Sequence, residues 1–582
     1  MRCAYDIQRS VREFDLTLPS EKRIHLRVGI HLGDVVENDG DIFGDAVNVA
    51  SRIESLAEGG GVCLTQQVHD HVHNKIDIPL VNMGKRSLKN VSEPIEVYKM
   101  VMPWDEGKAT SPTKLDKRRI AVLPLSNISP DPRDQYLVDG MTEELISTLS
   151  KIGELKVISR TSIMRYKTTS KSIDEIAKDL SVGSIIEGTI RKVSDDLRIS
   201  VQLIDAQTDE HLWSQDYDRK LDNVFGIQKE IALKVSEALK IQLLSYEKDD
   251  LGRRATGNTQ AYTLYLKGRY FWNERTEHDL EKAAKYFEEA IKLDSQYALA
   301  YSGLADCYVI QGAYGWMMPA DAFPKAKECA MKAIGIDPRL AEPHATLGDV
   351  FNSYEGRWIE SEVEYKRAIE LKPSYATGHM WYGLLLLFLR RTKEAQEQIT
   401  LAFELDPLSR VGRLNLANAL IYAGKPRDAI ARLKTQLEAD PDFAYVHNTL
   451  AWAYFLDAKA GEAISEMKLA VATSGDDPIL KAELACVLGF SGRRDEANKI
   501  LEELEEASKA KYFSKMKMAQ VLFATGKTDD AFRCLEEARE DHSVFTQHGG
   551  YPLDMMVFPC FAEVKEDPRW DAFAKHLRIP EV

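Results

Sequence analysis

The sequence predicts a multidomain protein that is α+β over residues 1–245 and entirely α-helical after them. Strand-like and helix-like segments alternate in the first part, whereas the second part repeats apolar residues at helical spacing. With 582 residues, 44% of them hydrophobic, the chain can build more than one buried core. Two polar stretches read as exposed linkers, residues 102–117 and 246–258. We therefore expect domains at residues 1–101, 118–245 and 259–582.

The amino-acid composition limits which kinds of partner and which cellular compartment we expect. A net charge of −15 and a sequence pI near 5.5 provide no basic field for a phosphate backbone, so we expect no nucleic-acid partner. Seven scattered cysteines without CxxC spacing predict core thiols rather than a zinc site or a disulfide framework. The start, MRCAYDIQRS, has no apolar core like that of a signal peptide, and no apolar run approaches a membrane span. We expect a cytoplasmic protein with no membrane partner.

The first segment contains a strand, turn, strand and helix in close succession. Residues 24–37 (IHLRVGIHLGDVVE) alternate like a strand, residues 38–40 (NDG) signal a hairpin turn, and residues 41–44 (DIFG) return as a short strand. Residues 45–58 (DAVNVASRIESLAE) are helical and end at a run of glycines. A strand, a helix and a final strand, SEPIEVYKM, complete the segment. The residues expected on the buried face of the helix are Val47, Ala50, Ile53 and Leu56.

Two polar residues of this helix share one side. Asn48 and Arg52 are four residues apart, so their side chains project one turn from each other. A guanidinium beside an amide is suited to stabilising charge that develops on a transferring phosphoryl group. Asp41, seven residues before Asn48, could accept a hydrogen bond from an exocyclic base amine. Lys89, in the loop before the last strand, could contact a triphosphate.

The ordered run RVGIHLGDV followed by DIFGDAVNVASR resembles the class III nucleotide cyclases. The resemblance implies part of a ferredoxin-like cyclase domain that converts ATP to cyclic AMP and pyrophosphate with Mg²⁺ or Mn²⁺. At matching positions, Asp41 corresponds to the adenine-selecting aspartate and Lys89 to the phosphate-contacting lysine. Asn48 and Arg52 correspond to the pair that orients the ribose and stabilises the transition state. Guanylate cyclases usually carry a Cys or Ser type of residue at position 41, so the aspartate favours adenine.

The chain departs from the family in its metal site. The two aspartates that hold the metal ions lie in the first half of the family's domain, whereas Asp34, Asp39 and Asp45 occupy other positions. We therefore expect no metal ligands in this segment and no cyclase activity from this chain alone. Residues 3–14 form an apolar-faced helix that begins without a cap, as if entered midway.

Three explanations for this departure compete. The true start could lie upstream of Met1, or the gene could have been truncated and the remnant retained as an appendage. The family also builds its sites at a dimer interface, with metal ligands from one subunit and the Asn/Arg pair from the other. This half could therefore serve a complete partner. The incomplete sheet, with an unpaired apolar edge at RVGIHLGDVV, makes that third explanation the weakest.

The middle segment predicts a small α/β layer with a partly parallel sheet. A strand and helix pair is repeated, and then come two strands with a turn at residues 194–196 and a closing helix. The runs AVLPLSNIS, YLVDGMTEELISTLSKI and VISRTS resemble the amino-terminal domain of TolB-type proteins, which implies an assembly or ligand-sensing role. Polar residues follow the first strand, where α/β folds often place ligands, but such loops are commonly polar and we interpret them as structural. They are Ser126, Ser129, Asp131 and Arg133.

The last segment carries a repeat of about 34 residues. Prolines at positions 338, 373, 407, 441 and 478 follow amphipathic helical patterns, and a small residue such as Gly348 or Ala451 marks a preceding helix. This pattern resembles the tetratricopeptide repeat, in about eight units closed by a terminal cap. Such a solenoid has a groove for a protein or peptide partner. We interpret Trp381 and Trp452 as repeat core rather than as ligand contacts.

Two functional hypotheses follow. The first is a bacterial-type adenylate cyclase family signalling protein, with ATP as substrate, an unidentified protein in the repeat groove and a possible homodimer. The alternative is a non-catalytic scaffold in which the repeats carry the function and the cyclase segment is vestigial.

Overall fold

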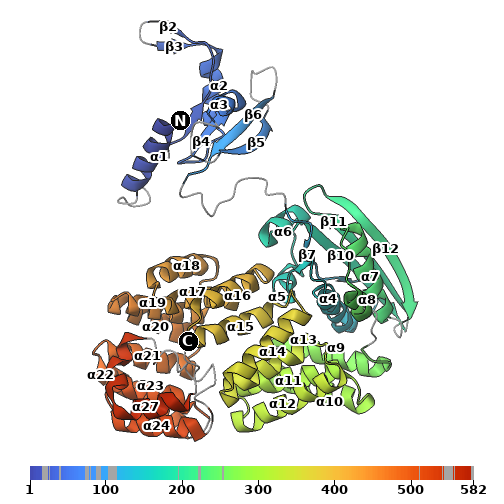
Figure 1. Cartoon of the computed structure of the whole chain (residues 1–582), viewed down its shortest axis with the longest axis vertical. Helices are drawn as coiled ribbons and strands as arrows, with labels where there is room; N and C mark the ends of the chain where they lie inside the picture. The colour runs from blue at the N-terminus through green and yellow to red at the C-terminus, as the bar shows by residue number, and fades with distance from the viewer. Residues whose placement is uncertain are drawn as a thin grey trace. The chain divides into compact units, whose positions relative to one another are not determined.

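The computed structural model divides the chain into two compact units, residues 1–115 and 116–582, which are described separately below (Figure 1). No helix among the described residues combines the length and the apolar character needed to span a membrane. The structure describes residues 1–15, 24, 26–38, 41–72, 78, 80–86, 94–102, 115–194, 196–220, 224–251, 255–509, 512–540, 542, 555 and 558–577.

The first unit is a mixed α/β unit with a four-stranded sheet in the order β1-β4-β6-β5 and a separate β2-β3 hairpin. β1 pairs with β4 in parallel, and the remaining pairs are antiparallel. Buried Gln8 ties the first helix to two loops, because its amide nitrogen donates to the carbonyl oxygens of Leu26 and Gly61, each at 3.0 Å. The elements are α1 (Arg2–Asp15), β1 (Val28–Ile30), β2 (Val36–Asn38), β3 (Asp41–Phe43), α2 (Asp45–Glu54), β4 (Val62–Thr65), α3 (Gln66–Val72), β5 (Leu80–Arg86) and β6 (Ile95–Met100).

The predicted hairpin is confirmed, but the strand predicted over residues 24–37 is broken. Its first part pairs with β4, and the second pairs with β3 in a different sheet. At the break, Nδ1 of His31 lies 3.0 Å from the hydroxyl of Thr65, after which the chain leaves the four-stranded sheet. Strand β5 was not predicted, because a register shift between Asn82 and Lys85 interrupts the alternation that a sequence pattern requires.

The second unit begins with a sheet in the order β12-β11-β10-β7-β9, with β8 beside β10. β7 lies parallel to β9 and β10, which confirms the predicted partly parallel sheet. Ser194, at a φ of 55°, lies in the predicted turn. The single strand expected after this turn is two strands, β11 and β12. The elements are β7 (Arg119–Val122), β8 (Ser126–Asn127), η2 (Pro132–Asp134), α4 (Gln135–Leu149), β9 (Lys156–Val157), α5 (Arg160–Ile163), η3 (Met164–Tyr166), α6 (Ile173–Leu180), β10 (Ser184–Val193), β11 (Asp196–Asp205), β12 (Glu210–Lys220) and α7 (Val224–Ala238).

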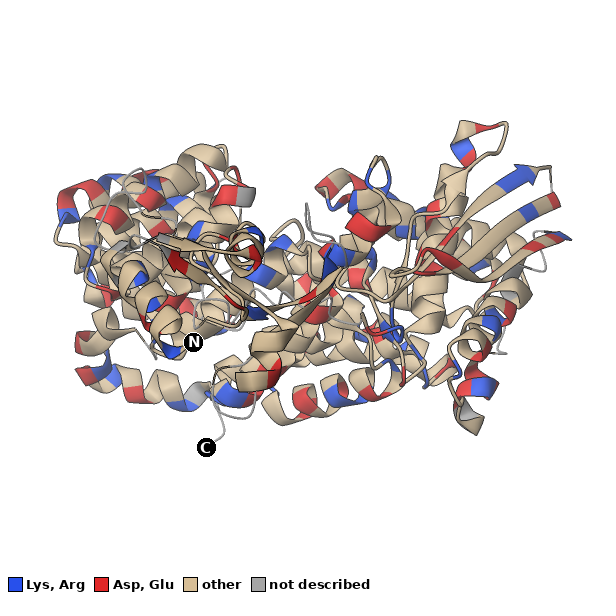
Figure 2. Ribbon diagram, turned by 90° about the horizontal axis from the view of Figure 1, so that it is seen from above, with Lys and Arg blue, Asp and Glu red and all other residues tan. Residues whose placement is uncertain are grey.

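Helices α9 to α24 form eight antiparallel hairpins in the described residues, as the repeat predicts (Figure 1). Acidic and basic residues are interspersed along these helices (Figure 2), consistent with pairs such as Arg391–Glu394 at 2.6 Å. The helices are α9 (Thr259–Glu274), α10 (Glu277–Leu293), α11 (Ala298–Ala313), α12 (Pro319–Ile336), α13 (Ala341–Val350), α14 (Trp358–Leu371), α15 (Ala376–Phe388), α16 (Thr392–Leu405), α17 (Arg410–Tyr422), α18 (Pro426–Ala439), α19 (Ala444–Leu456), α20 (Ala460–Thr473), α21 (Pro478–Phe490), α22 (Arg494–Ala507), α23 (Lys515–Thr525) and α24 (Thr528–Glu540). A short π-helix, η5 (Phe351–Glu355), follows α13.

Several turns between hairpins contain one of the repeating prolines, and the side chain six residues after that proline contacts its carbonyl oxygen. Nε2 of His344, His379 and His447 lies 3.4, 3.0 and 3.2 Å from the carbonyl oxygen of that proline. Arg413 replaces histidine after Pro407 and donates to the proline carbonyl at 3.1 Å. A Pro-x5-His spacing in the sequence would have revealed this contact.

The segment 246–258, expected to be an exposed linker, begins within helix α8 (Ser245–Leu251). Glu247 of this helix is buried, and its carboxylate accepts hydrogen bonds from the backbone N–H groups of Gly153 at 2.9 Å and Leu244 at 2.7 Å. These bonds join α8 to the α/β part of the second unit. The stretch is polar because it supplies this contact as well as the connection.

The edge of the α/β sheet packs against the helical hairpins. The hydroxyl of Ser374 accepts a hydrogen bond from the N–H of Val157 at 3.1 Å and donates to the carbonyl of Leu155 at 2.8 Å. The N–H of Ser159 donates to the carbonyl of Leu405 at 2.8 Å. Because β9 is the last strand of its sheet, these bonds satisfy backbone groups that an edge strand leaves open.

The C-terminal segment, predicted as a terminal cap, contacts the last hairpin through Arg569 and Asp529 of α24, and it also runs back over earlier hairpins. It comprises η7 (Pro559–Phe561), α26 (Ala562–Glu566) and α27 (Pro568–His576). The ring of Phe558 lies 5.8 Å from that of Tyr422 in α17 and 5.3 Å from that of Trp452 in α19. Trp452 is therefore buried, as repeat core would be, but by the chain's own C-terminal segment.

Candidate functional site

The predicted catalytic helix follows directly on the β2-β3 hairpin. Gly44 joins β3 to α2 at a φ of 142°, and a Cβ atom there would lie 3.1 Å from the carbonyl oxygen of Asp34. Ile53 anchors the helix, since it is fully buried in the core with Cys63 and Val97. Val47, expected on the same buried face, is 36% exposed. The helix is thus held mainly by its C-terminal half.

Asn48 and Arg52 both lie on the exposed surface of α2, one turn apart. Neither side chain forms a hydrogen bond or ion pair with any other described residue. Their availability is what a helix that meets a ligand or a second subunit requires. Asp41 is the first residue of β3, and its backbone pairs with Asn38 of β2. The structure does not describe the side chain of Asp41, so its predicted role stays a prediction. Lys89 also lies outside the described residues, so its predicted role stays a prediction.

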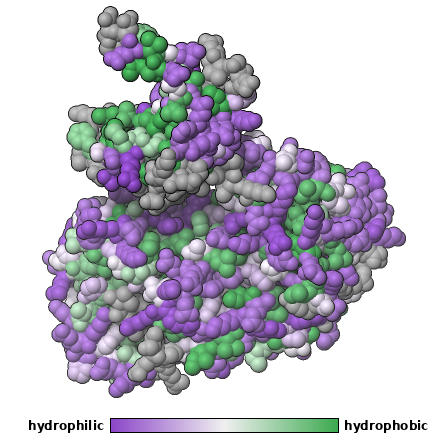
Figure 3. Space-filling model, turned by 45° about the horizontal axis from the view of Figure 1, so that its top comes forward, coloured by the Kyte–Doolittle hydropathy of each residue, from purple (hydrophilic) through white to green (hydrophobic). Residues whose placement is uncertain are grey.

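The hairpin beside these residues presents apolar side chains to the surface. Val36, Ile42 and Phe43 are 66%, 57% and 55% exposed. Figure 3 shows such apolar atoms at the surface of the first unit. Neighbouring exposed apolar side chains of this kind are a common feature of interaction surfaces.

The described residues do not fit a metal site in this unit. No group of three His, Cys, Asp or Glu side chains among them could hold a metal ion. Asp34 and Asp45 are exposed, and Asp39 lies outside the described residues.

The polar loop after β7 has a structural role. Asp131 is the N-cap of η2, and its carboxylate accepts hydrogen bonds from the backbone and side chain of Arg133. The hydroxyl of Ser129 accepts from the N–H of Lys192 at 3.0 Å. These bonds agree with the interpretation of the loop as structural.

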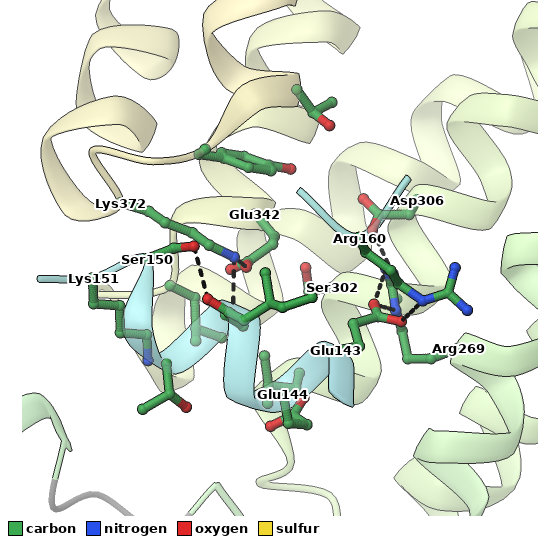
Figure 4. Close-up of a pocket in the computed structure, with 18 of the residues that line it drawn as sticks. Glu143, Glu144, Ser150, Lys151, Arg160, Arg269, Ser302, Asp306, Glu342 and Lys372 are labelled. Carbon is green, nitrogen blue, oxygen red and sulfur yellow. Dashed lines mark hydrogen bonds and ion pairs between the residues drawn. The ribbon is translucent and has the colours of Figure 1, made fainter. Parts of the chain in front are cut away.

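A second candidate site, not predicted from the sequence, is a cavity of about 640 Å³ in the second unit (Figure 4). One wall is helix α4, and the opposite wall is formed by the first helices of four successive hairpins, α9, α11, α13 and α15. Its centre is charged: Arg269 pairs with Glu143 at 2.5 Å, and Lys372 pairs with Glu342 at 2.7 Å. The sequence does contain an indication of this cavity: Glu143 and Glu144 are adjacent acids in a helix that is otherwise rich in apolar residues.

Parts of the chain match models of three known families. Residues 3–101 match the adenylate and guanylate cyclase catalytic domain. The first unit is therefore similar to part of a cyclase catalytic domain. Residues 271–315 and 414–478 match the tetratricopeptide repeat, in agreement with the eight hairpins. Residues 116–233 match the second domain of HilA/YgeH-like transcriptional regulators. The TolB resemblance expected for this middle part stays a prediction.

Individual proteins are similar to longer or other parts of the chain. A protein of Rhizobium meliloti (strain 1021) named "Putative adenylate cyclase 3" is 31% identical over 412 residues, which cover 68% of this chain and 63% of that protein. The transcriptional regulator HilA of Salmonella typhimurium is 28% identical over 136 residues, 23% of this chain and 24% of HilA. The chain thus spans less than two thirds of the length of either relative.

A solved adenylate/guanylate cyclase/hydrolase from Silicibacter pomeroyi is 40% identical and has a TM-score of 0.17. The match covers 18% of this chain and 60% of the solved one.

Proposed function

We propose that this partial cyclase domain contributes to an adenylate cyclase that converts ATP to cyclic AMP and pyrophosphate. The observation that carries the proposal is the presentation of Asn48 and Arg52 on one exposed side of α2, within a segment that matches the cyclase catalytic domain. The guanidinium of Arg52 stabilises the charge that develops as the bond to pyrophosphate breaks. Asn48 orients the ribose, Asp41 accepts a hydrogen bond from the adenine amine, and Lys89 contacts the phosphates.

The family implies Mg²⁺ or Mn²⁺, but the described residues offer no fitting ligand set, so we derive no step through a metal. The apolar hairpin formed by β2 and β3 supports a dimer. A second subunit that covered Val36, Ile42 and Phe43 would meet the same unit that carries Asn48 and Arg52.

Three further features belong to this proposal. No disulfide joins the cysteines among the described residues, which supports a reducing compartment such as a bacterial cytoplasm. The tetratricopeptide repeats support a protein partner, bound to hairpin surfaces that the chain's own segments leave free. A TolB-like sensing role for residues 118–245 would let the second unit regulate cyclic AMP signalling.

The test is cyclic AMP formation from Mg²⁺-ATP and Mn²⁺-ATP. The chain is assayed alone and with an equimolar Rhizobium meliloti relative that carries alanine at its own equivalents of Asn48 and Arg52. Activity in the mixture would then depend on this chain. Arg52→Ala should reduce that activity about 100-fold or more, because it removes a donor to the transition state. Arg86→Ala, on the exposed end of β5, is the matched control and should leave the activity unchanged.

A non-catalytic scaffold is the second candidate. The lack of a fitting metal-ligand set in the described residues favours it. Cyclic AMP at background levels both alone and in the mixture would support the scaffold and contradict the cyclase proposal.

A further inference from the structure

The cavity in the second unit lies where the α/β part meets the helical hairpins. Helix α4 contributes Glu143 and Glu144 to the lining, and α11 contributes Ser302 and Asp306 (Figure 4). A volume of about 640 Å³ falls within the range of small-molecule sites, which often form at domain boundaries. Because α4 already lies against these hairpins, the remaining space suits a small molecule better than an extended peptide.

Most of the basic side chains around this cavity already have acidic partners. Arg269 and Arg160 both pair with Glu143, at 2.5 and 3.2 Å. Lys372 donates to Glu342 at 2.7 Å and to the hydroxyl of Ser147 at 3.0 Å. Arg339 pairs with Asp250. These pairs leave little positive charge to bind an anion in the centre of the cavity.

Two further cations line the cavity nearer to solvent. Arg275 is exposed and stacks on the ring of Trp272 at 3.6 Å, and Lys151 is half-buried. Arg275 already interacts with the Trp272 ring and with the charge of Asp306, and water reaches Lys151.

Two acceptors inside the cavity have unmet demands. Glu144 is largely buried and makes no hydrogen bond or ion pair with other described residues, and burial together with the charge of Glu143 raises its pKa to about 7. Ser302 is 3% exposed, and its hydroxyl has no hydrogen-bond partner in the described structure. A buried carboxylate and a buried hydroxyl without partners each carry a desolvation cost that a ligand's N–H donors would offset.

We infer that this cavity binds a small organic cation with a primary ammonium group, which donates to the carboxylate of Glu144 and the hydroxyl of Ser302. The ammonium supplies both the positive charge and the donors that these two side chains lack. The aromatic rings of Tyr265 and Tyr375, which also line the cavity, suit the carbon chain of such a ligand. The inference is independent of the cyclase reaction, since it uses only residues of the second unit.

The test is isothermal titration calorimetry of the full chain with 1,4-diaminobutane at pH 7 and constant ionic strength. We expect saturable binding with one site per chain. Glu144→Gln should weaken binding at least about tenfold, because it removes a charge-assisted bond and keeps the side chain's shape. Ser302→Ala should weaken it severalfold. Glu438→Gln, an exposed glutamate on α18, is the matched control and should bind like the unmodified chain.

A proton readout separates this site from weak surface binding. The charges that face Glu144 come from Glu143, Lys151, Glu342 and Lys372. Adding a ligand cation lowers the pKa of Glu144, so binding at pH 7 should release a fraction of a proton, seen as a heat that varies with the ionisation enthalpy of the buffer. Absence of saturable binding, equal binding by Glu144→Gln, or equal proton release by that variant would each overturn the inference.

Discussion

The indole Nε1 of Trp358 donates a 2.7 Å hydrogen bond to the carbonyl oxygen of Leu577, 219 positions further along the chain. Trp358 begins the second helix of the third hairpin, and Leu577 follows the last helix, α27. Arg569 at the start of α27 pairs with Asp529 of α24 at 2.9 Å. One short segment thus links the third hairpin to the eighth. In a simple repeat array each hairpin contacts only its neighbours, so this link is an additional long-range contact.

Loss of the hydrogen bond between Trp358 and Leu577 should weaken the attachment of the C-terminal segment to the third hairpin. We expect Trp358→Phe to lower the free energy of unfolding by about 1–3 kcal/mol, because the buried carbonyl of Leu577 loses its donor. Urea denaturation of the full chain measures this. Trp316→Phe, which preserves an aromatic ring beside Tyr314, is the control. Equal losses in both variants would show that the indole's size matters and its hydrogen bond does not.

The sheet edge at β9 should depend on Ser374. Replacing Ser374 by alanine leaves the N–H of Val157 and the carbonyl of Leu155 without this partner, at a cost of about 1–3 kcal/mol. Amide hydrogen exchange at residues 155–159 should speed up. Ser465→Ala, on the exposed side of α20, removes a local hydroxyl bond and should leave exchange at 155–159 unchanged. Unaltered exchange in Ser374→Ala would contradict the proposed protection.

Close helix packing within a hairpin should make one glycine irreplaceable. A Cβ atom on Gly383 would lie 2.5 Å from Cγ1 of Ile399 and 3.3 Å from the carbonyl oxygen of Ala395, so Gly383→Ala should destabilise the chain by about 1–3 kcal/mol. At Gly335, near the end of α12, a Cβ atom would meet nothing within 4 Å. Gly335→Ala should therefore stabilise by about 0.5–1 kcal/mol. Thermal denaturation compares the two, and shifts of the same sign would contradict the packing argument.

Glu144 should make stability depend on pH. Burial, followed by the charge of Glu143, raises its pKa from 4.5 to about 7, so the folded state holds a proton that the unfolded state releases between these values. The resulting penalty is absent below pH 4.5, grows up to about pH 7 and is complete above it. Glu144→Gln removes the penalty. The variant should be more stable than the parent at pH 8 by on the order of 2 kcal/mol, and by only about a quarter of that amount at pH 5.

Urea denaturation at the two pH values measures this difference. Glu438→Gln should show no comparable pH-dependent gain, since its side chain is exposed. A gain for Glu144→Gln that is the same at pH 5 and pH 8 would mean that ionisation of the carboxyl is not its cause.

The sequence by itself determined the features that depend on local spacing. The recurrence of prolines about 34 residues apart predicted the helical hairpins, because a proline ends one helix and small residues allow the next pair to approach. The four-residue spacing of Asn48 and Arg52 placed them on one side of a helix for the same local reason. The sequence did not predict two irregular features of the strands. Strand β5 has a shifted register, and β11 and β12 were predicted as one strand because no turn pattern separated them.

Only the tertiary structure decided how the parts of the second unit close on one another. Ser374 meets Val157 across 217 positions and Trp358 meets Leu577 across 219, through side-chain bonds to backbone groups. Such bonds need one polar side chain at the right place and leave no periodic pattern in the sequence. The cavity arises from the same packing, because its lining combines Glu144 of α4 with Ser302 of α11, which lie far apart in the sequence.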